Sequence, residues 1–430
     1  MNKPLRIGIV GLGTVGCGVV DIFQRNNALL NMRAKRDLEI TCVSSQNKKR
    51  TRPIDTSAYE WVDSALDMAS RDDVDVIVEL IGGEEGVAKT LVEAALKNGK
   101  HVVTANKALL AHHGFSLAQL AEKNKVQLMY EAAVAGGIPI IKSMREGFAG
   151  NKITAVYGIL NGTCNYILTE MRETGRDFET VLSEAQEKGF AEADPSFDVD
   201  GIDAAHKLCI LSALAFGVKP DYKKLPVTGI RHITASDITY AEDLGYRIKL
   251  LGITHCKNGE IIQSVEPCLV HEDSTMGAVE GVFNTVLVEG DAIDHGQSIG
   301  RGAGAGPTGS SVVADIIDIA RGYNVPTFGV PCEALSDANW ADSGKWESRF
   351  YMHLSVTDRA GVLADIAHVL KENNVSVEAL AQLSHNPDNP VSITLTTHKV
   401  AQESITKAIN AIAGLPAVLT EPTMLRIEEI

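Results

Sequence analysis

Residues 5–16, "LRIGIVGLGTVG", decide the fold of the first part of this chain. The stretch begins as an apolar run typical of a buried strand and ends in three glycines spaced as G-x-G-x-x-G, namely Gly11, Gly13 and Gly16. In a strand–turn–helix unit these glycines permit a tight turn, close approach of a pyrophosphate and close packing of helix on strand. We therefore expect a dinucleotide site, with Thr14 and Val15 at the helix start offering free N–H groups to the phosphates. The alternative is a turn that merely tolerates glycine.

The end of the second predicted strand, residues 38–44, indicates whether the ribose of such a cofactor carries a 2′-phosphate. NAD enzymes usually place an acidic residue there, but Asp37 and Glu39 stand at the start of this strand. The strand instead runs into "SSQNKKR", in which small hydroxyls precede three cations. These residues suit the 2′-phosphate of NADP, although a solvated basic loop has the same composition. We expect NADP in preference to NAD, with contacts from Ser44, Lys48 and Arg50.

The composition of the whole chain narrows the classes of protein to consider. Its 430 residues are too many for one ordinary core, so two or three domains are expected. A formal net charge of −15 argues against nucleic acid or an anionic membrane as a partner. No apolar run approaches the length of a membrane span, and the N-terminus lacks the layout of a signal peptide. Seven scattered cysteines without C-x-x-C spacing indicate reduced thiols in the cytoplasm and no structural zinc.

The rhythm of apolar segments predicts an α/β protein with three folded regions. In residues 1–130, strands alternate with helical segments, which is typical of a Rossmann-type parallel sheet that binds NAD(P). In residues 131–322, helices precede long strands joined by an Asn258-Gly259 turn, which indicates an α+β domain with an antiparallel sheet. Residues 323–347 have little periodicity and are interpreted as a linker.

The last region, residues 348–430, has a pattern of its own. Strand, helix, strand, strand, helix and strand follow one another, which is the order of a ferredoxin-like domain. The segment "HNPDNP", residues 385–390, has the composition of a turn between the two middle strands.

A strongly acidic stretch, "GFAEADPSFDVDGIDAAHKL" at residues 189–208, places five carboxylates before one lysine. If a helix starts near Asp200, Asp203 and Lys207 lie four residues apart on one face. One interpretation is a capped, solvated helix start with Asp200 as N-cap. The other is a binding site for a small molecule that carries an ammonium group.

Four motifs together resemble the homoserine dehydrogenase family. They are "TANKALL" (104–110), "NGTCNYIL" (161–168), the acidic stretch and "GRGAGAGPTG" (300–309). The segment at 356–378, "VTDRAGVLADIAHVLKENNVSVE", resembles an ACT domain, a small regulatory module that binds amino acids. The resemblance implies NAD(P)H-dependent, reversible reduction of L-aspartate 4-semialdehyde to L-homoserine, in threonine, methionine and isoleucine biosynthesis.

The resemblance also implies roles for individual residues. It assigns proton donation to Lys207 and contact with substrate or nicotinamide to Lys107, which follows a predicted strand at the edge where such sheets bind ligands. Gly306 is expected to approach the cofactor from the side opposite the first glycine-rich loop. Asp194, Asp198 and Asp200 are expected to be mainly structural. The residues expected to hold or line the substrate are Glu192, Asp203, Thr163 and Gly189, with Asn161 and Gly162 nearby.

The role of residues 131–322 as catalytic and dimerisation domain and a cation site follow from the resemblance alone. The segment "EAAVAGGIP" matches one where the family binds a monovalent cation such as Na⁺; the expected ligands are Glu131 and the backbone of Val134, Gly136 and Ile138. In the ACT domain, an amino-acid effector, with L-threonine as the natural hypothesis, is expected at a strand-to-helix turn. That turn contains Asp358, Gly361, Val362 and Leu363. ACT domains commonly pair edge to edge, so a homodimer or homotetramer is expected.

Two alternative functions remain open at the level of sequence. Cys164, at a helix start near the expected nicotinamide, would serve as nucleophile in an acylating aldehyde dehydrogenase. A non-catalytic amino-acid sensor would also combine a Rossmann domain with an ACT domain.

Overall fold

A six-stranded parallel sheet forms the N-terminal part of the computed structural model, which describes residues 3–383 and 390–430. Its strand order is β3-β2-β1-β4-β5-β6. The strands are β1 (Leu5–Val10), β2 (Leu38–Ser44), β3 (Glu60–Trp61), β4 (Val76–Glu79), β5 (His101–Thr104) and β6 (Leu128–Met129). The predicted parallel sheet is confirmed.

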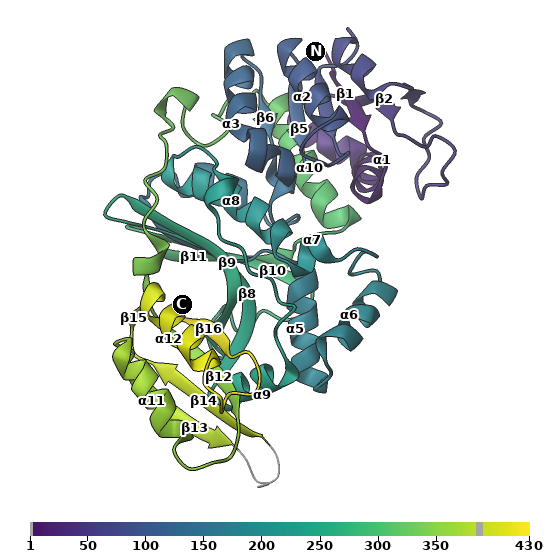
Figure 1. Ribbon diagram of the computed structural model, residues 1–430. Helices are drawn as coiled ribbons and strands as arrows, with labels where there is room; N and C mark the ends of the chain where they lie inside the picture. The colour runs from purple at the N-terminus through teal and green to yellow at the C-terminus, as the bar shows by residue number, and fades with distance from the viewer. Residues whose placement is uncertain (1–2, 384–389) are drawn as a thin grey trace.

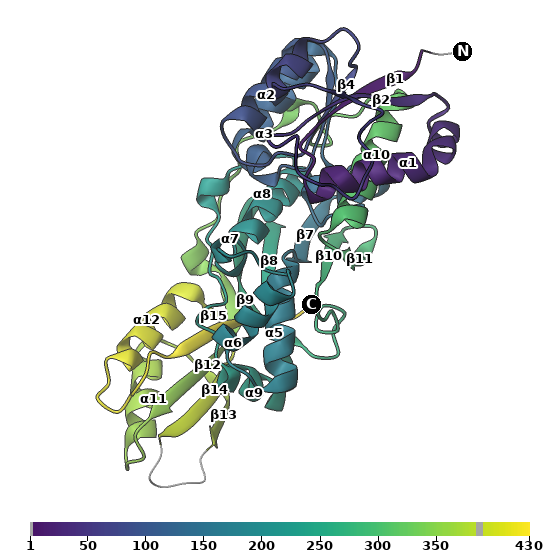
Figure 2. The same ribbon diagram turned by 90° about the vertical axis from the view of Figure 1, so that its right-hand side faces the viewer.

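Helices cover both faces of this sheet (Figure 2). Ile7 and Ile9 of β1 pack into one apolar core with α1 and α10, whereas Val10 and Ile77 pack into another with α2 and α3. These helices are α1 (Thr14–Ala34), α2 (Val87–Lys97), α3 (Lys107–Asn124) and α10 (Ala305–Ala320). The late helix α10 thus returns to the N-terminal sheet and lies against α1 (Figure 1).

The middle of the chain builds a long mixed sheet with helices packed on it. Five of its strands are β7 (Ile153–Ile159), β8 (Tyr246–Lys257), β9 (Glu260–His271), β10 (Phe283–Gly290) and β11 (Asp294–Arg301). The predicted Asn258-Gly259 turn joins β8 to β9, with both residues at positive φ, 54° and 83°. The helices here are α5 (Gly162–Thr174), α6 (Phe178–Glu187), α7 (Ser196–Val199), α8 (Ile202–Phe216) and α9 (Ala235–Asp243).

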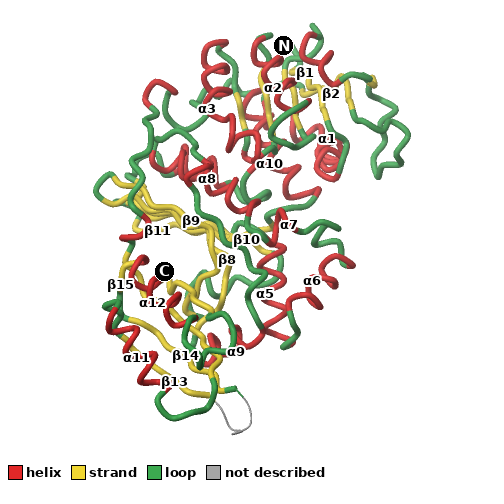
Figure 3. The backbone as a smooth tube through the Cα atoms, viewed as in Figure 1, coloured by secondary structure: helices red, strands yellow, loops and turns green. Residues whose placement is uncertain are grey.

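The C-terminal region has the predicted ferredoxin-like order, and it extends the same sheet. Its elements are β12 (Glu347–Val356), α11 (Val362–Glu372), β13 (Val377–Leu383), β14 (Val391–Thr397), β15 (Val400–Ala401), α12 (Gln402–Ala413) and β16 (Thr423–Glu428). Strand β16 pairs in parallel with β9, through Arg426 opposite Cys268, so one ten-stranded sheet has the order β11-β10-β7-β8-β9-β16-β12-β14-β13, with β15 pairing with β12 outside this order. Figure 3 shows the strands of both regions as one continuous layer. The predicted turn at 385–390 lies outside the described residues except for Pro390.

Three details differ from the sequence expectations. The helix expected at 310–322 begins already at Ala305. The helix expected from Asp200 begins at Ile202, because Gly201 occupies the N-cap in the left-handed conformation with φ 83°. The segment 323–347 is more than a linker, since Ser336 and Trp340 bridge to Val218 and Ile261.

Candidate active site

A buried carboxylate between two lysines forms the centre of the candidate site. Asp203, on the first turn of α8, is 4% exposed. Its Oδ1 lies 3.1 Å from Nζ of Lys107, and its Oδ2 lies 2.6 Å from Nζ of Lys207. Lys207 follows one turn later on α8, as the spacing of four residues predicted. Lys107 comes from another domain, at the start of α3, where the side chain of Asn106 caps the helix by accepting the Leu109 N–H.

Main-chain and amide groups hold this cluster in place. Nδ2 of Asn161 donates to Asp203 at 2.8 Å and to Asp198 at 2.7 Å, while its Oδ1 accepts the Cys164 N–H and caps α5. The carbonyl of Leu160 accepts a hydrogen bond from Lys207 at 2.7 Å. The end of β7 therefore positions both the carboxylate and the lysine, and a buried charge needs such partners.

The electrostatics of the cluster keep Asp203 ionised. Burial opposes ionisation, but the ammonium groups of Lys207 and Lys107 and the hydrogen bonds from Lys207 and Asn161 hold the pKa of Asp203 well below its usual range. The charge of Asp203 in turn raises the pKa of Lys107, so that Lys107 carries a proton at neutral pH. Burial and the neighbouring charge of Asp203 raise the pKa of Asp198. The ionised carboxylate of Asp203 therefore lies between the ammonium groups of Lys107 and Lys207.

The other residues of the acidic stretch divide into two groups. Asp198 turns inward and accepts hydrogen bonds from Asn161 and from Thr163, at 3.3 Å, so the expectation that it is mainly structural is corrected here: it belongs to the site network. Asp200 turns outward to Arg231 at 2.5 Å and is not an N-cap. Its carboxylate is partly exposed, as in an ordinary surface ion pair.

The loop between α6 and α7 carries the remaining predicted substrate residues. Thr163 reaches it by donating to the carbonyl of Phe190 at 2.8 Å. Glu192 is exposed, and its charge contributes to the raised pKa of Lys107, which places it within electrostatic reach of the cluster. Gly189 is also exposed, with φ 74°. Asp194 accepts the Ser196 N–H at 3.1 Å within the loop.

Cys164 lacks the features of a nucleophile. Its side chain is fully buried, and its Sγ donates to the carbonyl of Asp198 at 3.2 Å. Burial and the charges of Asp198 and Asp203 raise the pKa of this thiol well above its ordinary value. Nucleophilic cysteines are thiolates in electropositive, accessible surroundings. The acylating mechanism is therefore not favoured.

Two adjoining cavities of about 410 and 570 Å³ lie over the first glycine-rich loop. Both are lined by Gly13, Arg50 and Arg52; Gly306 and Thr14 line the first, and Ser44 lines the second. Lys48 instead lies over the ring of Trp61, with Nζ 5.6 Å from the ring centre. The sequence reading missed Arg52, whose guanidinium donates to the carbonyls of Leu12, Asn47 and Arg50 at 2.7–3.1 Å and so ties the basic loop to the glycine loop.

The glycines of the motif have the predicted geometry. Gly11 has φ 100°, and a Cβ at Gly16 would lie 2.0 Å from the carbonyl oxygen of Gly11. A Cβ at Gly13 would meet nothing within 4 Å, so this position opens onto free space. Together with the cavities, the open backbone at Gly13 fits a nicotinamide dinucleotide. Val15 lies half-buried in the first turn of α1.

The predicted cation segment is a buried loop beside α10. Both carboxylate oxygens of Glu131 accept backbone N–H groups, from Ile141 at 2.8 Å and Lys142 at 2.9 Å. Burial and the charge of Asp315 raise the pKa of Glu131 to about 7. Among the predicted backbone ligands, the carbonyl of Gly136 accepts from Ser311 at 2.6 Å and that of Ile138 accepts the Ile140 N–H at 2.8 Å. Val134 is fully buried.

The predicted effector turn lies at the other end of the molecule, between β12 and α11. Gly361 occupies the N-cap of α11 with φ 98°, and Val362 is buried beneath it. Asp358 and Leu363 are exposed, so their side chains are accessible to a ligand.

Comparisons with known proteins agree over the full length of the chain. The profile described as "Homoserine dehydrogenase, NAD binding domain" matches residues 11–131, "Homoserine dehydrogenase" matches 139–317 and "ACT domain" matches 354–417. Homoserine dehydrogenases of Neisseria gonorrhoeae and Pseudomonas aeruginosa are each 43% identical, over 100% of this chain and 99% and 100% of theirs. The solved structure of a homoserine dehydrogenase from Thiobacillus denitrificans has a TM-score of 0.93 at 41% identity, over 99% of both chains.

One solved relative contains a cofactor. A hyperthermophilic archaeal homoserine dehydrogenase in complex with NADPH has a TM-score of 0.63 and 26% identity, covering 74% of this chain and 97% of its own. The sensor alternative has no such support. With its glycine loop, its buried lysine–aspartate–lysine cluster and its C-terminal module, this chain belongs to the homoserine dehydrogenase family.

Proposed function

We propose that this chain catalyses the reversible reduction of L-aspartate 4-semialdehyde to L-homoserine, with a nicotinamide dinucleotide as hydride donor. The observation that carries the proposal is the Lys107–Asp203–Lys207 cluster around a buried carboxylate, at the carboxyl edge of the sheet that also carries the glycine loop. When bound, the cofactor supplies a hydride to the aldehyde carbon. The chain must then protonate the oxygen that becomes an alkoxide.

Lys207 is the proposed proton donor. It is 7% exposed, and its Nζ donates hydrogen bonds to Asp203 and to the Leu160 carbonyl. These two contacts fix the direction of the third N–H, which remains for the substrate. An ammonium donates both a hydrogen bond and a proton, and a fixed donor needs no reorganisation in the transition state. Both oxygens of Asp203 are engaged by lysines, so we assign Asp203 to positioning them. Lys107 is assigned to contact with the substrate or nicotinamide.

The remaining substrate contacts come from the loop before α7. Glu192, Thr163 and Gly189 lie on or against this loop, and we propose that they hold the amino-acid end of the substrate. The exposed carboxylate of Glu192 suits the substrate ammonium.

The test compares K207A with K207R, using aspartate 4-semialdehyde with NADPH and with NADH. If Lys207 donates the proton, both variants lose at least 100-fold in kcat, because arginine keeps the charge but holds its proton too tightly. Binding of the nucleotide, followed by its fluorescence, should be unchanged. Full activity of K207R would leave Lys207 with an electrostatic role only, and full activity of K207A would overturn the assignment.

NADP is the proposed preferred cofactor. The cavity over the basic loop offers Arg50 and Ser44, whose cation and hydroxyl suit a 2′-phosphate.

We also propose that Na⁺ binds at Glu131 with the carbonyls of Val134, Gly136 and Ile138, whose second lone pairs remain for a cation.

For the C-terminal region we propose feedback control. We propose that an amino-acid effector, L-threonine as the end product of the pathway, binds at the turn that contains Asp358, Gly361, Val362 and Leu363. The proposed assembly is a homodimer or a homotetramer. D358A should keep catalytic activity and lose sensitivity to threonine.

We place the enzyme in the cytoplasm, because all seven cysteines are free thiols. Among residues 3–383 and 390–430, no helix combines the length and apolarity needed to cross a membrane.

A further inference from the structure

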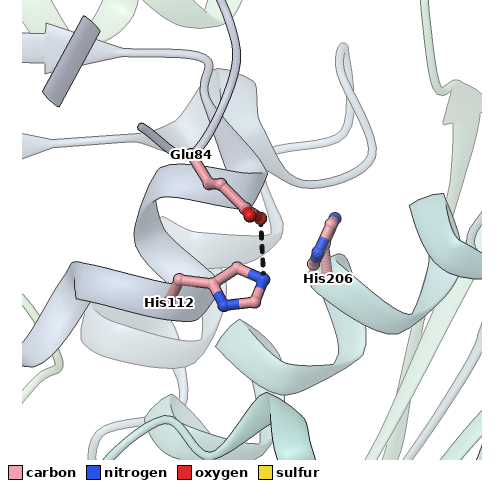
Figure 4. A group of neighbouring side chains, drawn as sticks. All are labelled: Glu84, His112 and His206. Atoms are coloured by element: carbon pink, nitrogen blue, oxygen red, sulfur yellow. Dashed lines mark ion pairs between the residues drawn. The ribbon is translucent and has the colours of Figure 1, made fainter. Parts of the chain in front are cut away.

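Three potential metal ligands converge outside the catalytic cluster. Glu84 lies in the loop before α2, His112 on α3 and His206 on α8, and Figure 4 shows their side chains facing one another. Their ligand atoms all lie within 4.8 Å of one another, and Oε2 of Glu84 is 3.0 Å from Nε2 of His112. None of the three has a role in the proposed reaction.

His206 is the residue that distinguishes this group from an ordinary surface ion pair. Its side chain is 3% exposed, and within the described part of the chain its Nδ1 has no hydrogen-bond partner. A buried nitrogen left unsatisfied costs about 1–3 kcal/mol, so its presence calls for a ligand. A neutral imidazole with a free ring nitrogen is the form of histidine that binds metals.

The surroundings fix the orientation of this imidazole. The ring of His206 lies tilted against that of Tyr222, with ring centres 4.5 Å apart, and its centre is 5.5 Å from that of Phe197. The ring of His112 lies 5.3 Å away at a steep angle and also contacts Tyr222 at 4.8 Å. Aromatic walls that hold ligands from several sides restrict their rotamers, which favours a preformed site.

We propose that Glu84, His112 and His206 bind a divalent transition metal ion of the Zn²⁺ class. Two imidazoles and one carboxylate are a favourable donor set for such an ion, and water would complete the tetrahedron. With bonds of about 2.0–2.1 Å, the ligand atoms of a tetrahedral ion are about 3.3 Å apart. Glu84 and His112 are already near that separation, and both are partly exposed, so small rotations bring them to the fixed His206.

An ion at this site would join two domains beside the catalytic cluster. Glu84 follows the residues Leu80 and Ile81 that line the larger cofactor cavity, and His206 directly precedes Lys207. The nearby ammonium of Lys107 opposes a cation, whereas the carboxylates of Glu84 and Asp203 favour it. The bound ion would thus connect the loop that follows the cofactor cavity, through Glu84, to α8, through His206.

The first test measures Zn²⁺ affinity of the full chain by competition with a chromogenic chelator, after treatment with EDTA. Wild type should bind one equivalent at this site, and E84Q and H112Q should each lose at least tenfold in affinity, or about 1.4 kcal/mol. Both positions are partly exposed, so folding is preserved. The matched controls are E85Q and H113Q, because this neighbouring pair is 2.7 Å apart on the same loop and helix but has no third ligand among the residues that the structure describes. They should change the affinity less than twofold.

The second test identifies the donor atoms with Co²⁺. The visible absorption of the Co²⁺-loaded chain should indicate tetrahedral coordination by nitrogen and oxygen, and H206Q should abolish it. A sulfur-to-cobalt charge-transfer band would place the ion on a cysteine and overturn the assignment. Equal losses in E84Q and E85Q, or no binding by wild type at micromolar Zn²⁺, would also overturn it.

Discussion

Replacing Asp203 by Asn removes the buried carboxylate between the buried ammonium group of Lys207 and the half-buried one of Lys107. At an effective dielectric constant of about 20, unit charges 2.6 and 3.1 Å apart attract by roughly 6 and 5 kcal/mol. Much of this attraction offsets the cost of burying the charges, and breaking a buried pair typically costs about 3–5 kcal/mol. We expect D203N to lose free energy of unfolding in that range at pH 7.5, and at least 100-fold in kcat/KM because both lysines lose their position.

The matched control is D200N, three residues earlier on the same stretch. Asp200 pairs with Arg231 at 2.5 Å, but the two side chains are 42% and 43% exposed, so its loss should cost about 0–1 kcal/mol. Urea unfolding followed by circular dichroism gives both values from the midpoints at a common slope. The D203N deficit should shrink only above about pH 10.4, the ordinary pKa of lysine, because Asp203 raises the pKa of Lys107 further. Equal losses below about 1 kcal/mol in both variants would refute the reasoning.

Three further predictions concern the cofactor and the buried loop. G13A should fold with wild-type stability and bind nicotinamide nucleotides at least tenfold more weakly, whereas G16A should lower the melting temperature because its Cβ meets the Gly11 carbonyl at 2.0 Å. R50A should raise KM for NADP at least tenfold in initial-rate assays and leave KM for NAD unchanged; equal changes would exclude a 2′-phosphate contact. Because burial and the charge of Asp315 raise the pKa of Glu131 from 4.5 to about 7, the folded state binds more protons than the unfolded state between these two pH values. Wild-type stability should therefore fall as pH rises from about 4.5 through 7 and then level off, and melting curves of E131Q should lack this slope.

Local spacing was enough to find part of the site. Asp203 and Lys207 are one helical turn apart, so their pairing follows from the sequence. Lys107 follows a strand at the ligand-binding edge, so its position could be expected, but its contact with Asp203 joins two domains and has no signature in local periodicity.

Asp198 shows where sequence reasoning ended. It lies in a four-residue helix within an acidic stretch, and nothing local distinguishes it from Asp200. Hydrogen bonds from Asn161, 37 residues earlier, and from Thr163 turn this carboxylate inward. Arg52 was missed for a similar reason, because a cation that binds main-chain carbonyls looks in sequence like any other charge of a basic loop.

The pairing of β9 with β16 could not be predicted either, since parallel partners more than 150 residues apart leave no local pattern. It means that the C-terminal module is joined to the middle region by strand pairing as well as by the chain between them. Main-chain hydrogen bonds run from the module through β9 to β8, and α8 packs on these two strands. A ligand that changed the twist of the C-terminal strands would therefore act on the strands that carry α8, and through α8 on Asp203 and Lys207.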